Sequence, residues 1–312
     1  MITAFYHPGF AAPIGERHIM AMRKFRLVAE QLRSRPEVRL EEPAPVTEEQ
    51  LRFVHTAEYI QAIRTGVPRE LAESQKFPWS EALFPSVCLT NGAVIAAGRR
   101  ALRDGAATAL ASGFHHAHAD HGEGFCTFNG LVVAADTLQR SGEVKRVAIL
   151  DLDLHYGNGT AALAGSRDYL TALSIYGSDY WDNEAYLDVT KPRHEDGANH
   201  FSATLPRGCD GKQLNASLDK HLPRLLEAGQ PDLLLYQAGA DPLRDDPYSP
   251  LALTHADLLE RDRRVFDFAK RRTLPIAWVL AGGYARDLSK VVEAHVNTFI
   301  AASRIFGRYA PV

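Results

Sequence analysis

The sequence predicts an α/β fold in which helices flank one mostly parallel β-sheet, organised as a single domain over residues 1–312. Three observations support this prediction. Short apolar runs end in polar residues, segments with helical spacing of apolar residues lie between these runs, and 46% of the 312 residues are hydrophobic. Strands that alternate with helices are typical of parallel sheets, and a chain of this length and composition buries a sizeable core.

The predicted strands are short runs in which nearly every residue is apolar. This pattern is typical of strands that are buried on both faces of a sheet. In chain order the strands are Ala106–Ser112, Val147–Leu150, Leu170–Ile175, Leu233–Gln237 and Ile276–Leu280.

The predicted helices carry apolar residues at helical spacing. They are Met20–Leu32, Glu48–Arg64, Val87–Arg103, Gly130–Gln139, Lys212–Glu227, His255–Lys270 and Leu288–Phe306. Thr47 and Thr254 are expected to cap two of them at the N-terminus. Gly66–Pro85 and Gly177–His200 fit neither pattern and are expected to form long surface loops.

Composition excludes several classes of function. The net charge is -3, so no basic excess indicates nucleic-acid binding. The N-terminal segment lacks the pattern of a signal peptide, and no apolar stretch is long enough to insert into a membrane. Cys88, Cys126 and Cys209 form no paired motif, which is typical of a reducing compartment. We therefore expect a cytoplasmic protein.

Polar side chains follow four of the predicted strands at the point where each strand ends. They belong to the segments Gly113–His116, Asp151–His155, Ala238–Asp241 and Ala281–Tyr284. Ligands of parallel α/β folds bind outside the carboxyl ends of the strands. We therefore expect two imidazoles, an Asp-x-Asp-x-His sequence, a further aspartate and a tyrosine to face one crevice.

Asp151, Asp153 and His155 alternate along extended backbone, which places their side chains on one face. Carboxylates at the end of an apolar strand are costly to desolvate unless a cation compensates their charge. With Asp241 from another strand, two carboxylates and one imidazole leave one position open on a tetrahedral zinc ion, as in catalytic zinc sites. The alternative is that Asp151 and Asp153 cap the next helix and that His155 is a packed loop histidine.

His115 and His116 follow a predicted strand, and Tyr284 follows two glycines. Adjacent imidazoles can divide the roles of proton acceptor and proton donor, and a carboxylate partner raises the pKa of one of them. A phenol near a metal-bound carbonyl can donate to a developing oxyanion. The alternative for the histidine pair is that one is exposed and the other is packed in the core. The alternative for Tyr284 is an aromatic residue at an interface.

Five motifs in this order resemble the histone deacetylase family of the arginase/deacetylase superfamily. They are Gly113–Ala117, Gly122–Cys126, Asp151–His155 with Gly157–Gly159, Gln237–Asp241 and Gly282–Tyr284. The resemblance extends from about Thr90 to the C-terminus, and the N-terminal segment with His7 and His18 is similar to the bacterial class IV-type branch. It implies the arginase/deacetylase fold and a hydrolase that removes an acyl group from a lysine side chain, a peptide or a small amine.

The resemblance also implies a role for each matching residue. Asp153, His155 and Asp241 match the ligands of a zinc ion. His116 matches the general base and acid beside the zinc-bound water, and Tyr284 matches the tyrosine that stabilises the transition state. Fe²⁺ is an alternative to Zn²⁺, because nitrogen and oxygen ligands discriminate poorly between these ions.

Further matches concern the surroundings of the zinc site. His115 matches a partner that is hydrogen-bonded to Asp151, and Gly124 and Phe125 match the wall of an acyl-lysine channel. The resemblance also implies a structural K⁺ ion. Its matching residues are Asp151, Asp153, His155, Ser174 and Ile175.

The sequence departs from the family pattern at two positions. Asn158 stands beside the second histidine where many members have an aspartate, and Ala281 replaces a glycine before the tyrosine. An amide cannot stabilise an imidazolium as a carboxylate does, so His116 should stay neutral more readily and suit a base. His118 and His121 lie in the loop after the histidine pair; they could line the entrance to the site, but we expect them to be solvated loop residues.

Alternative functions remain open at this point. The same chemistry suits acetyl-lysine, longer acyl-lysine and acetylpolyamines. Arginase-like hydrolysis with two manganese ions would need a second set of ligands, which the sequence does not provide. An inactive binding module for acyl-lysine is also compatible with the fold, although the expected catalytic residues are all present.

Overall fold

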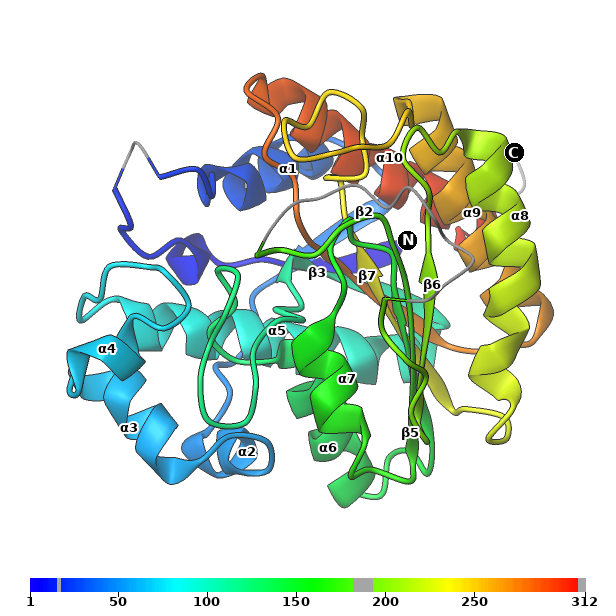
Figure 1. Ribbon diagram of the computed structural model, residues 1–312. Coiled ribbons are helices and arrows are strands. Elements are labelled where there is room, and N and C mark those ends of the chain that lie inside the picture. The colour runs from blue at the N-terminus through cyan, green and yellow to red at the C-terminus, as the bar shows by residue number, and fades with distance from the viewer. Residues whose placement is uncertain (16–17, 182–192, 308–312) are drawn as a thin grey trace.

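The computed structural model describes residues 1–15, 18–181 and 193–307. Its described residues form one eight-stranded β-sheet with the order β2-β1-β3-β8-β7-β4-β5-β6, in which all neighbouring strands are parallel (Figure 1). The strands are β1 (Ile2–Phe5), β2 (Val38–Glu41), β3 (Ala106–Ser112), β4 (Val147–Asp151), β5 (Leu170–Tyr176), β6 (His200–Thr204), β7 (Leu233–Ala238) and β8 (Ile276–Leu280). The predicted α/β class is confirmed.

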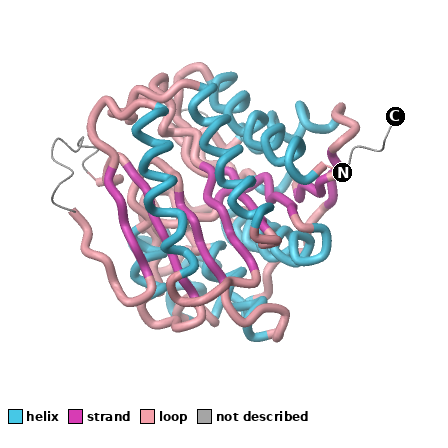
Figure 2. The backbone as a smooth tube through the Cα atoms, turned by 90° about the vertical axis from the view of Figure 1, so that its right-hand side faces the viewer, coloured by secondary structure: helices cyan, strands magenta, loops and turns pink. Residues whose placement is uncertain are grey.

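Helices cover both faces of the sheet (Figure 2). On one face α5, α6 and α7 contact β3, β4 and β5, and on the other face α1 and α8 lie with α9 and α10. The α-helices are α1 (Arg23–Arg33), α2 (Glu48–Arg52), α3 (Ala57–Thr65), α4 (Arg69–Ala72), α5 (Leu83–Asp104), α6 (Gly130–Arg140), α7 (Asn158–Ala164), α8 (Gly211–His221), α9 (His255–Arg271) and α10 (Leu288–Phe306). Two 3-10 helices are η1 (Pro8–Phe10) and η2 (Leu222–Leu226).

The five predicted strands are present, and their ends differ from the prediction by at most one residue. Every residue of β3, β4, β5, β7 and β8 is buried, which explains why their sequences are continuous apolar runs. The sequence did not reveal β1, β2 and β6. The strands β2 and β6 lie at the edges of the sheet and are mostly half-buried, so neither has a continuous apolar sequence.

Two of the predicted helices are divided. The segment Glu48–Arg64 forms α2 and α3, because the Thr56 side chain accepts a hydrogen bond from Tyr59 N and caps a new helix. The segment Lys212–Glu227 forms α8 and then η2, where Pro223 has no N–H to continue the α-helical ladder.

Both predicted N-caps are confirmed. Thr47 accepts from Gln50 N and Thr254 accepts from Asp257 N, and each threonine is part of a capping box. The prediction of a loop over Gly66–Pro85 is wrong in part, because α4 lies within this segment and α5 begins at Leu83. A proline in the first helical turn removes an N–H that has no intrahelical partner, so Pro85 is compatible with that start.

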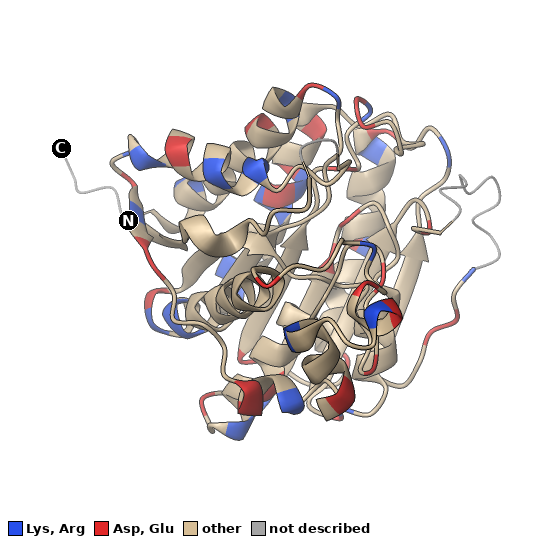
Figure 3. Cartoon of the chain, turned by 90° about the vertical axis from the view of Figure 1, so that its left-hand side faces the viewer, with Lys and Arg blue, Asp and Glu red and all other residues tan. Residues whose placement is uncertain are grey.

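The described part of Gly177–His200 contains no helix, and its only strand residue is His200, where β6 begins. Residues 182–192 lie outside the described residues. Figure 3 shows that acidic and basic residues are interspersed along the chain. Within the described ranges, no helix has the length and apolar character needed to span a bilayer. The single-domain organisation and the absence of a nucleic-acid partner stay predictions.

Candidate metal centre and active site

The topology brings the predicted site residues together at the carboxyl edge of the sheet. β3, β8, β7 and β4 are consecutive in the sheet, although they are far apart in sequence. β4 ends at Asp151, and the next residues include Asp153 and His155. Asp241 follows β7, and Tyr284 follows β8. Residues from four separate parts of the chain therefore share one site.

Asp153, His155 and Asp241 form a buried group in which one ligand atom from each lies within 4.8 Å of the others. His155 Nδ1 lies 3.2 Å from Asp153 Oδ1 and 3.2 Å from Asp241 Oδ2. Tetrahedral ligands at about 2.0–2.1 Å from zinc are roughly 3.3 Å apart, so these separations fit such an ion.

The electrostatics of this group also fit a cation. Burial, and then the charge of Asp153, raises the pKa of Asp241 to about 7. Asp241 Oδ2 is buried and receives no well-aligned hydrogen bond among the described residues, although His155 Nδ1 lies 3.2 Å away. A metal ion would compensate both carboxylates and coordinate that oxygen.

Backbone groups hold the two carboxylates in place. Asp153 Oδ2 accepts a hydrogen bond from Gly282 N at 2.8 Å, and Asp241 Oδ1 accepts from Leu154 N at 3.1 Å. A Cβ atom at position 282 would lie 1.8 Å from Asp241 Oδ2. The close approach of this backbone to the carboxylate therefore requires glycine.

His115 forms a buried pair with Asp151, and the two atoms His115 Nδ1 and Asp151 Oδ2 are 2.6 Å apart. Asp151 Oδ1 also accepts from Asp153 N at 3.0 Å, which fixes the carboxylate. Burial opposes a charge on His115, but the carboxylates of Asp151 and Asp153 raise its pKa. This environment favours an imidazolium, as a carboxylate partner is expected to do.

His116 lies beside this pair, with 3.9 Å between the centroids of the two imidazole rings. Its Nδ1 lies 2.7 Å from Asn158 Oδ1. Burial, and then the charges of His115 and His155, lowers the pKa of His116 well below its usual range. The Asn158 hydrogen bond raises the pKa, but the other effects are larger, so His116 stays neutral and can accept a proton.

The Tyr284 ring lies between the His155 and Tyr248 rings, at 6.4 and 5.5 Å between centroids. Its backbone N–H donates to Asp246 Oδ2 at 2.6 Å. Burial, and then the nearby Asp241 charge, raises the pKa of Tyr284 well above its usual value. The phenol therefore keeps its proton and can act as a hydrogen-bond donor.

Lys24 is a site neighbour that the sequence analysis did not identify. It is fully buried, its Nζ donates to Ala281 O at 2.5 Å, and Nζ lies 5.9 Å from the centroid of the Tyr284 ring. Burial lowers the pKa of Lys24 to about 8. The available signal was a lysine one residue before Phe25 on the buried face of α1.

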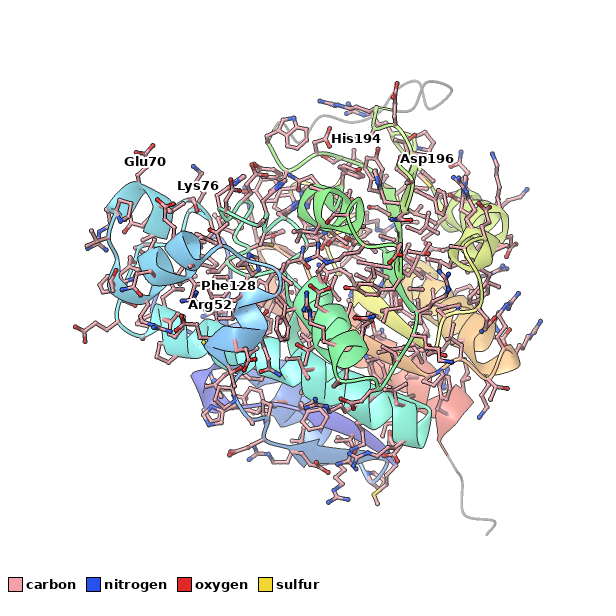
Figure 4. The ribbon with its side chains drawn as sticks, turned by 90° about the horizontal axis from the view of Figure 1, so that it is seen from below. Arg52, Glu70, Lys76, Phe128, His194 and Asp196 are labelled. Carbon is pink, nitrogen blue, oxygen red and sulfur yellow. The ribbon has the colours of Figure 1, made fainter. Side chains whose placement is uncertain are left out.

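A cavity of about 430 Å³ opens above the metal group. Most of its wall is aromatic, and Trp181 and Ile19 at its surface are about half exposed. Figure 4 labels one lining residue, Lys76. The lining residues are Ile19, Lys76, His116, Gly124, Phe125, His155, Tyr180, Trp181, Tyr248 and Tyr284. Apolar walls with a few polar groups are typical of small-molecule sites.

The predicted channel residues Gly124 and Phe125 both have left-handed backbone, with φ values of 48° and 65°. A Cβ atom on Gly124 would lie 2.4 Å from His116 Cδ2. The Phe125 ring stacks on Phe77 at 5.6 Å and contacts His18 at 5.1 Å between centroids. His18, to which the sequence analysis gave no role, therefore supports the cavity wall.

The residues predicted for potassium lie at the ends of β4 and β5. Asp151 and Ser174 are partners in the parallel register of these strands, and Ile175 follows. Ser174 Oγ accepts from Gly157 N at 3.4 Å. The fold brings the residues to one place, and the ion itself stays a prediction.

A second group of potential ligands, His118, His121 and Glu123, also has atoms within 4.8 Å of one another. The His118 and His121 rings stack at 4.6 Å with an interplanar angle of 5°. Both rings direct Nε2 toward the Glu123 carboxylate, at 3.6 Å for His118 and 3.3 Å for His121. The two histidines are half-buried, in contrast to the expectation of solvated loop residues.

The parallel sheet and the buried Asp-His-Asp group at its carboxyl edge define an α/β protein with a candidate metal-dependent hydrolytic centre. The fold is shared with the acetylpolyamine aminohydrolase from Burkholderia pseudomallei, with a TM-score of 0.78, 22% identity, and coverage of 98% of this chain and 99% of that one. The chain belongs to the histone deacetylase family, because the model of the histone deacetylase domain matches residues 18–299. The predicted family is thus confirmed, and membership supports deacetylase activity.

Two relatives illustrate the range of similarity. An uncharacterized protein from Picosynechococcus sp. is 31% identical over 305 residues, which cover 96% of this chain and 98% of the relative. Histone deacetylase 2 from Arabidopsis thaliana is 27% identical over 264 residues, which cover 82% of this chain and 66% of that protein. The chain therefore matches nearly all of the first relative and about two thirds of the second.

Proposed function

We propose that this protein is a zinc-dependent amidohydrolase that removes an acyl group from a lysine side chain or a related amine. One observation carries the proposal: His155 of the metal group, His116 and Tyr284 all line the same cavity. An acylated amine in this cavity would meet a metal ligand group, a neutral imidazole and a protonated phenol together.

A zinc ion held by Asp153, His155 and Asp241 would polarise the acyl carbonyl and acidify the attacking water. His116, which its lowered pKa keeps neutral, accepts a proton from the attacking water. Tyr284 donates a hydrogen bond to the carbonyl oxygen as negative charge develops there. The protonated imidazole of His116 then donates its proton to the leaving amine.

His115 and Asp151 hold His116 in position through contacts behind its ring. The 2.6 Å contact fixes the His115 ring, and the His115 and His116 rings pack against each other at 3.9 Å between centroids. We assign Asp151 to the orientation of His115, and Gly124 and Phe125 to the wall that guides the acyl chain.

The ions are also part of the proposal. Fe²⁺ could replace Zn²⁺ in the cell, because two carboxylates and an imidazole bind both ions. A K⁺ ion at Asp151, Asp153, His155, Ser174 and Ile175 would be structural. Metal analysis of protein purified under anaerobic conditions identifies the resident ion.

The other candidate functions have less support. Acetylpolyamines stay in the proposed substrate range because a solved relative with this fold is named an acetylpolyamine aminohydrolase. Arginase-like chemistry needs a second ligand set beside the first, and the other group of potential ligands among the described residues, His118, His121 and Glu123, shares no residue with the metal group. An inactive binding module would not need the His116 and Tyr284 arrangement.

The decisive experiment is hydrolysis of acyl-lysine peptides from acetyl to myristoyl, together with acetylated polyamines, by the metal-loaded protein. Asp241→Ala is the control, since it removes a metal ligand. We expect turnover that is lost in the control, and the preferred member defines the substrate class. Zinc-loaded protein without turnover on any member would contradict the proposed function.

We also infer a cytoplasmic location. The three cysteines are buried and form no disulfide, which is typical of proteins in a reducing compartment. Fractionation of cells that express the native gene tests this inference.

A further inference from the structure

The Asn158 side chain connects His116 to Glu123, a residue without a role in the chemistry described above. Asn158 Oδ1 lies 2.7 Å from His116 Nδ1, and Asn158 Nδ2 donates to Glu123 Oε2 at 2.6 Å. Asn158 Nδ2 also lies 3.2 Å from His118 Nε2. The loop after β3 and the first turn of α7 are therefore joined by one hydrogen-bonded chain.

The chemistry of this chain fixes the direction of each hydrogen bond. An ionised carboxylate only accepts, so the amide group that faces Glu123 must be the NH₂ group. The oxygen of Asn158 then faces His116 and can only accept, so His116 Nδ1 must carry a proton. A neutral imidazole with its proton on Nδ1 has its lone pair on Nε2.

We propose that Glu123 is a positioning residue that acts through Asn158 to hold His116 in the tautomer whose Nε2 accepts a proton. The proposal rests on the proposed function of His116 as the base. Without Glu123, the amide could turn over and present its NH₂ group to His116, which would select the opposite tautomer. His121 Nε2, 3.3 Å from Glu123 Oε1, helps to hold the Glu123 carboxylate.

Tyr180 provides a second support for Glu123. Its hydroxyl forms a hydrogen bond with the Glu123 side chain, and its ring packs on the His116 ring at 4.7 Å between centroids. Because Tyr180 also lines the cavity, Glu123 is connected to His116 through Asn158 and to the cavity wall through Tyr180. The position of Glu123 is therefore defined by three side chains.

The short contact between positions 123 and 158 limits which charges the two side chains can carry at the same time. A carboxylate at position 158 would meet Glu123 at about the present 2.6 Å separation, and two carboxylates at that distance cannot both ionise without a large cost. An aspartate at position 158 would, however, still accept from His116 Nδ1 and would need no Glu123 to fix that direction. Combining Glu123→Leu with Asn158→Asp therefore separates the tautomer of His116 from the identity of Glu123.

The kinetic test compares Glu123→Leu, the double variant of Glu123→Leu with Asn158→Asp, and Glu123→Gln, using the best substrate of the panel. We expect Glu123→Leu to lose about 10–100-fold in kcat, the usual cost of losing a partner that orients a histidine, with KM and zinc content unchanged. Glu123→Gln can present either its oxygen or its NH₂ group to Asn158, so its kcat should lie between those of Glu123→Leu and the wild type. Asp120→Asn, on an exposed side chain of the same loop, is the matched control.

The double variant is the decisive comparison. We expect Asn158→Asp to restore Glu123→Leu to within about threefold of the wild-type kcat, because a carboxylate at position 158 accepts from His116 Nδ1 without help from Glu123, and a purely structural loss could not be restored in this way. Wild-type kcat in Glu123→Leu, or no rescue in the double variant, would overturn the proposal. A general disturbance of the loop would instead reduce the activity of Asp120→Asn as well, and this result would also contradict it.

A second measurement does not depend on activity. Two-bond ¹H–¹⁵N correlation spectra of metal-free protein labelled at histidine report the tautomer of each ring, and His116→Phe assigns the signal of His116. We expect one Nδ1–H tautomer in the wild type and a mixture in Glu123→Leu. An unchanged tautomer in Glu123→Leu would overturn the inference, whereas absent turnover by the wild type would contradict only the proposed function.

Discussion

At the scale of single residues, Tyr284 is expected to stabilise the transition state rather than to bind substrate. Tyr284→Phe removes only the hydroxyl, so the protein should fold and keep its zinc. Loss of one such donor typically reduces turnover by about 10²–10³-fold, and we expect that loss in kcat with little change in KM. Steady-state kinetics together with metal analysis check this prediction. A change confined to KM would show that the hydroxyl contributes only to ground-state binding.

His55 makes the stability of the fold sensitive to acid. Its Nδ1 is 2.9 Å from His118 O, its Nε2 accepts from Asn129 N at 3.0 Å, and its ring packs on Phe128, which is labelled in Figure 4. Burial lowers the pKa of His55 to about 3, whereas an unfolded histidine has a pKa of about 6.5. The folded protein therefore holds this imidazole neutral at pH values where the unfolded chain binds a proton.

This difference in pKa predicts a contribution to stability that is complete above about pH 6.5 and decreases as the pH falls toward 3. Between these values, the contribution decreases by about 1.4 kcal/mol per pH unit. Urea unfolding of the wild type and of His55→Gln from pH 7.5 to pH 4.5 isolates the contribution. We expect the free-energy difference between the two proteins to shrink on acidification, and a constant difference would exclude the assignment.

At the scale of elements, α9 is fixed to the strand ends that carry the metal group. Asp262 accepts hydrogen bonds from Tyr236 in β7, Thr298 in α10 and Arg261, at 2.5, 2.6 and 2.8 Å. Arg261 Nη1 also donates to Gly239 O at 2.7 Å, two residues before the metal group residue that follows β7. One buried ion pair thus connects two helices to the active-site edge of the sheet.

Asp262→Ala should therefore destabilise the fold strongly, because it leaves the buried Arg261 guanidinium without its carboxylate. Removing one partner of a buried ion pair typically costs about 3–5 kcal/mol. Asp267→Ala in the same helix is the control, since Asp267 pairs with the exposed Arg271 and such pairs contribute about 0–1 kcal/mol. Denaturant unfolding of both variants checks the contrast. Similar losses in the two variants would contradict the role of the buried network.

At the scale of the whole molecule, the metal group should couple ion binding to folding. Asp153 and Asp241 are almost fully buried, and the unfolded chain has no preformed site, so a bound ion stabilises only the folded state. Zinc at about 1,000 times its Kd would add about 4 kcal/mol. For a protein of this size, that corresponds to a rise in Tm of at least about 5 °C.

The matched variant is Asp241→Asn, which removes one buried charge and keeps an oxygen for the Leu154 N–H. We expect the metal-free variant to melt at or above the Tm of metal-free wild type, because the repulsion between two carboxylates is relieved. Zinc should shift its Tm far less. Differential scanning calorimetry with and without zinc measures both effects, and an undiminished zinc shift in the variant would argue against Asp241 as a ligand.

The sequence predicted those elements whose residue pattern lies within one short segment of the chain. Each central strand is buried on both faces, so its apolar run marks its ends to within one residue. The caps at Thr47 and Thr254 are local hydrogen bonds between residues three apart. The edge strands β2 and β6 were missed because half-buried strands of four and five residues carry no such run.

The sequence by itself determined the fold class, the family and the residues that meet at the carboxyl edge, because parallel α/β topology places every strand end at the same edge. Only the tertiary structure decided which groups make contact there. Lys24 behind Tyr284, Arg261 beneath the strand ends and Glu123 beside Asn158 are long-range contacts. Each depends on the relative position of segments that are not adjacent in sequence, and neither periodicity nor motif spacing encodes that position.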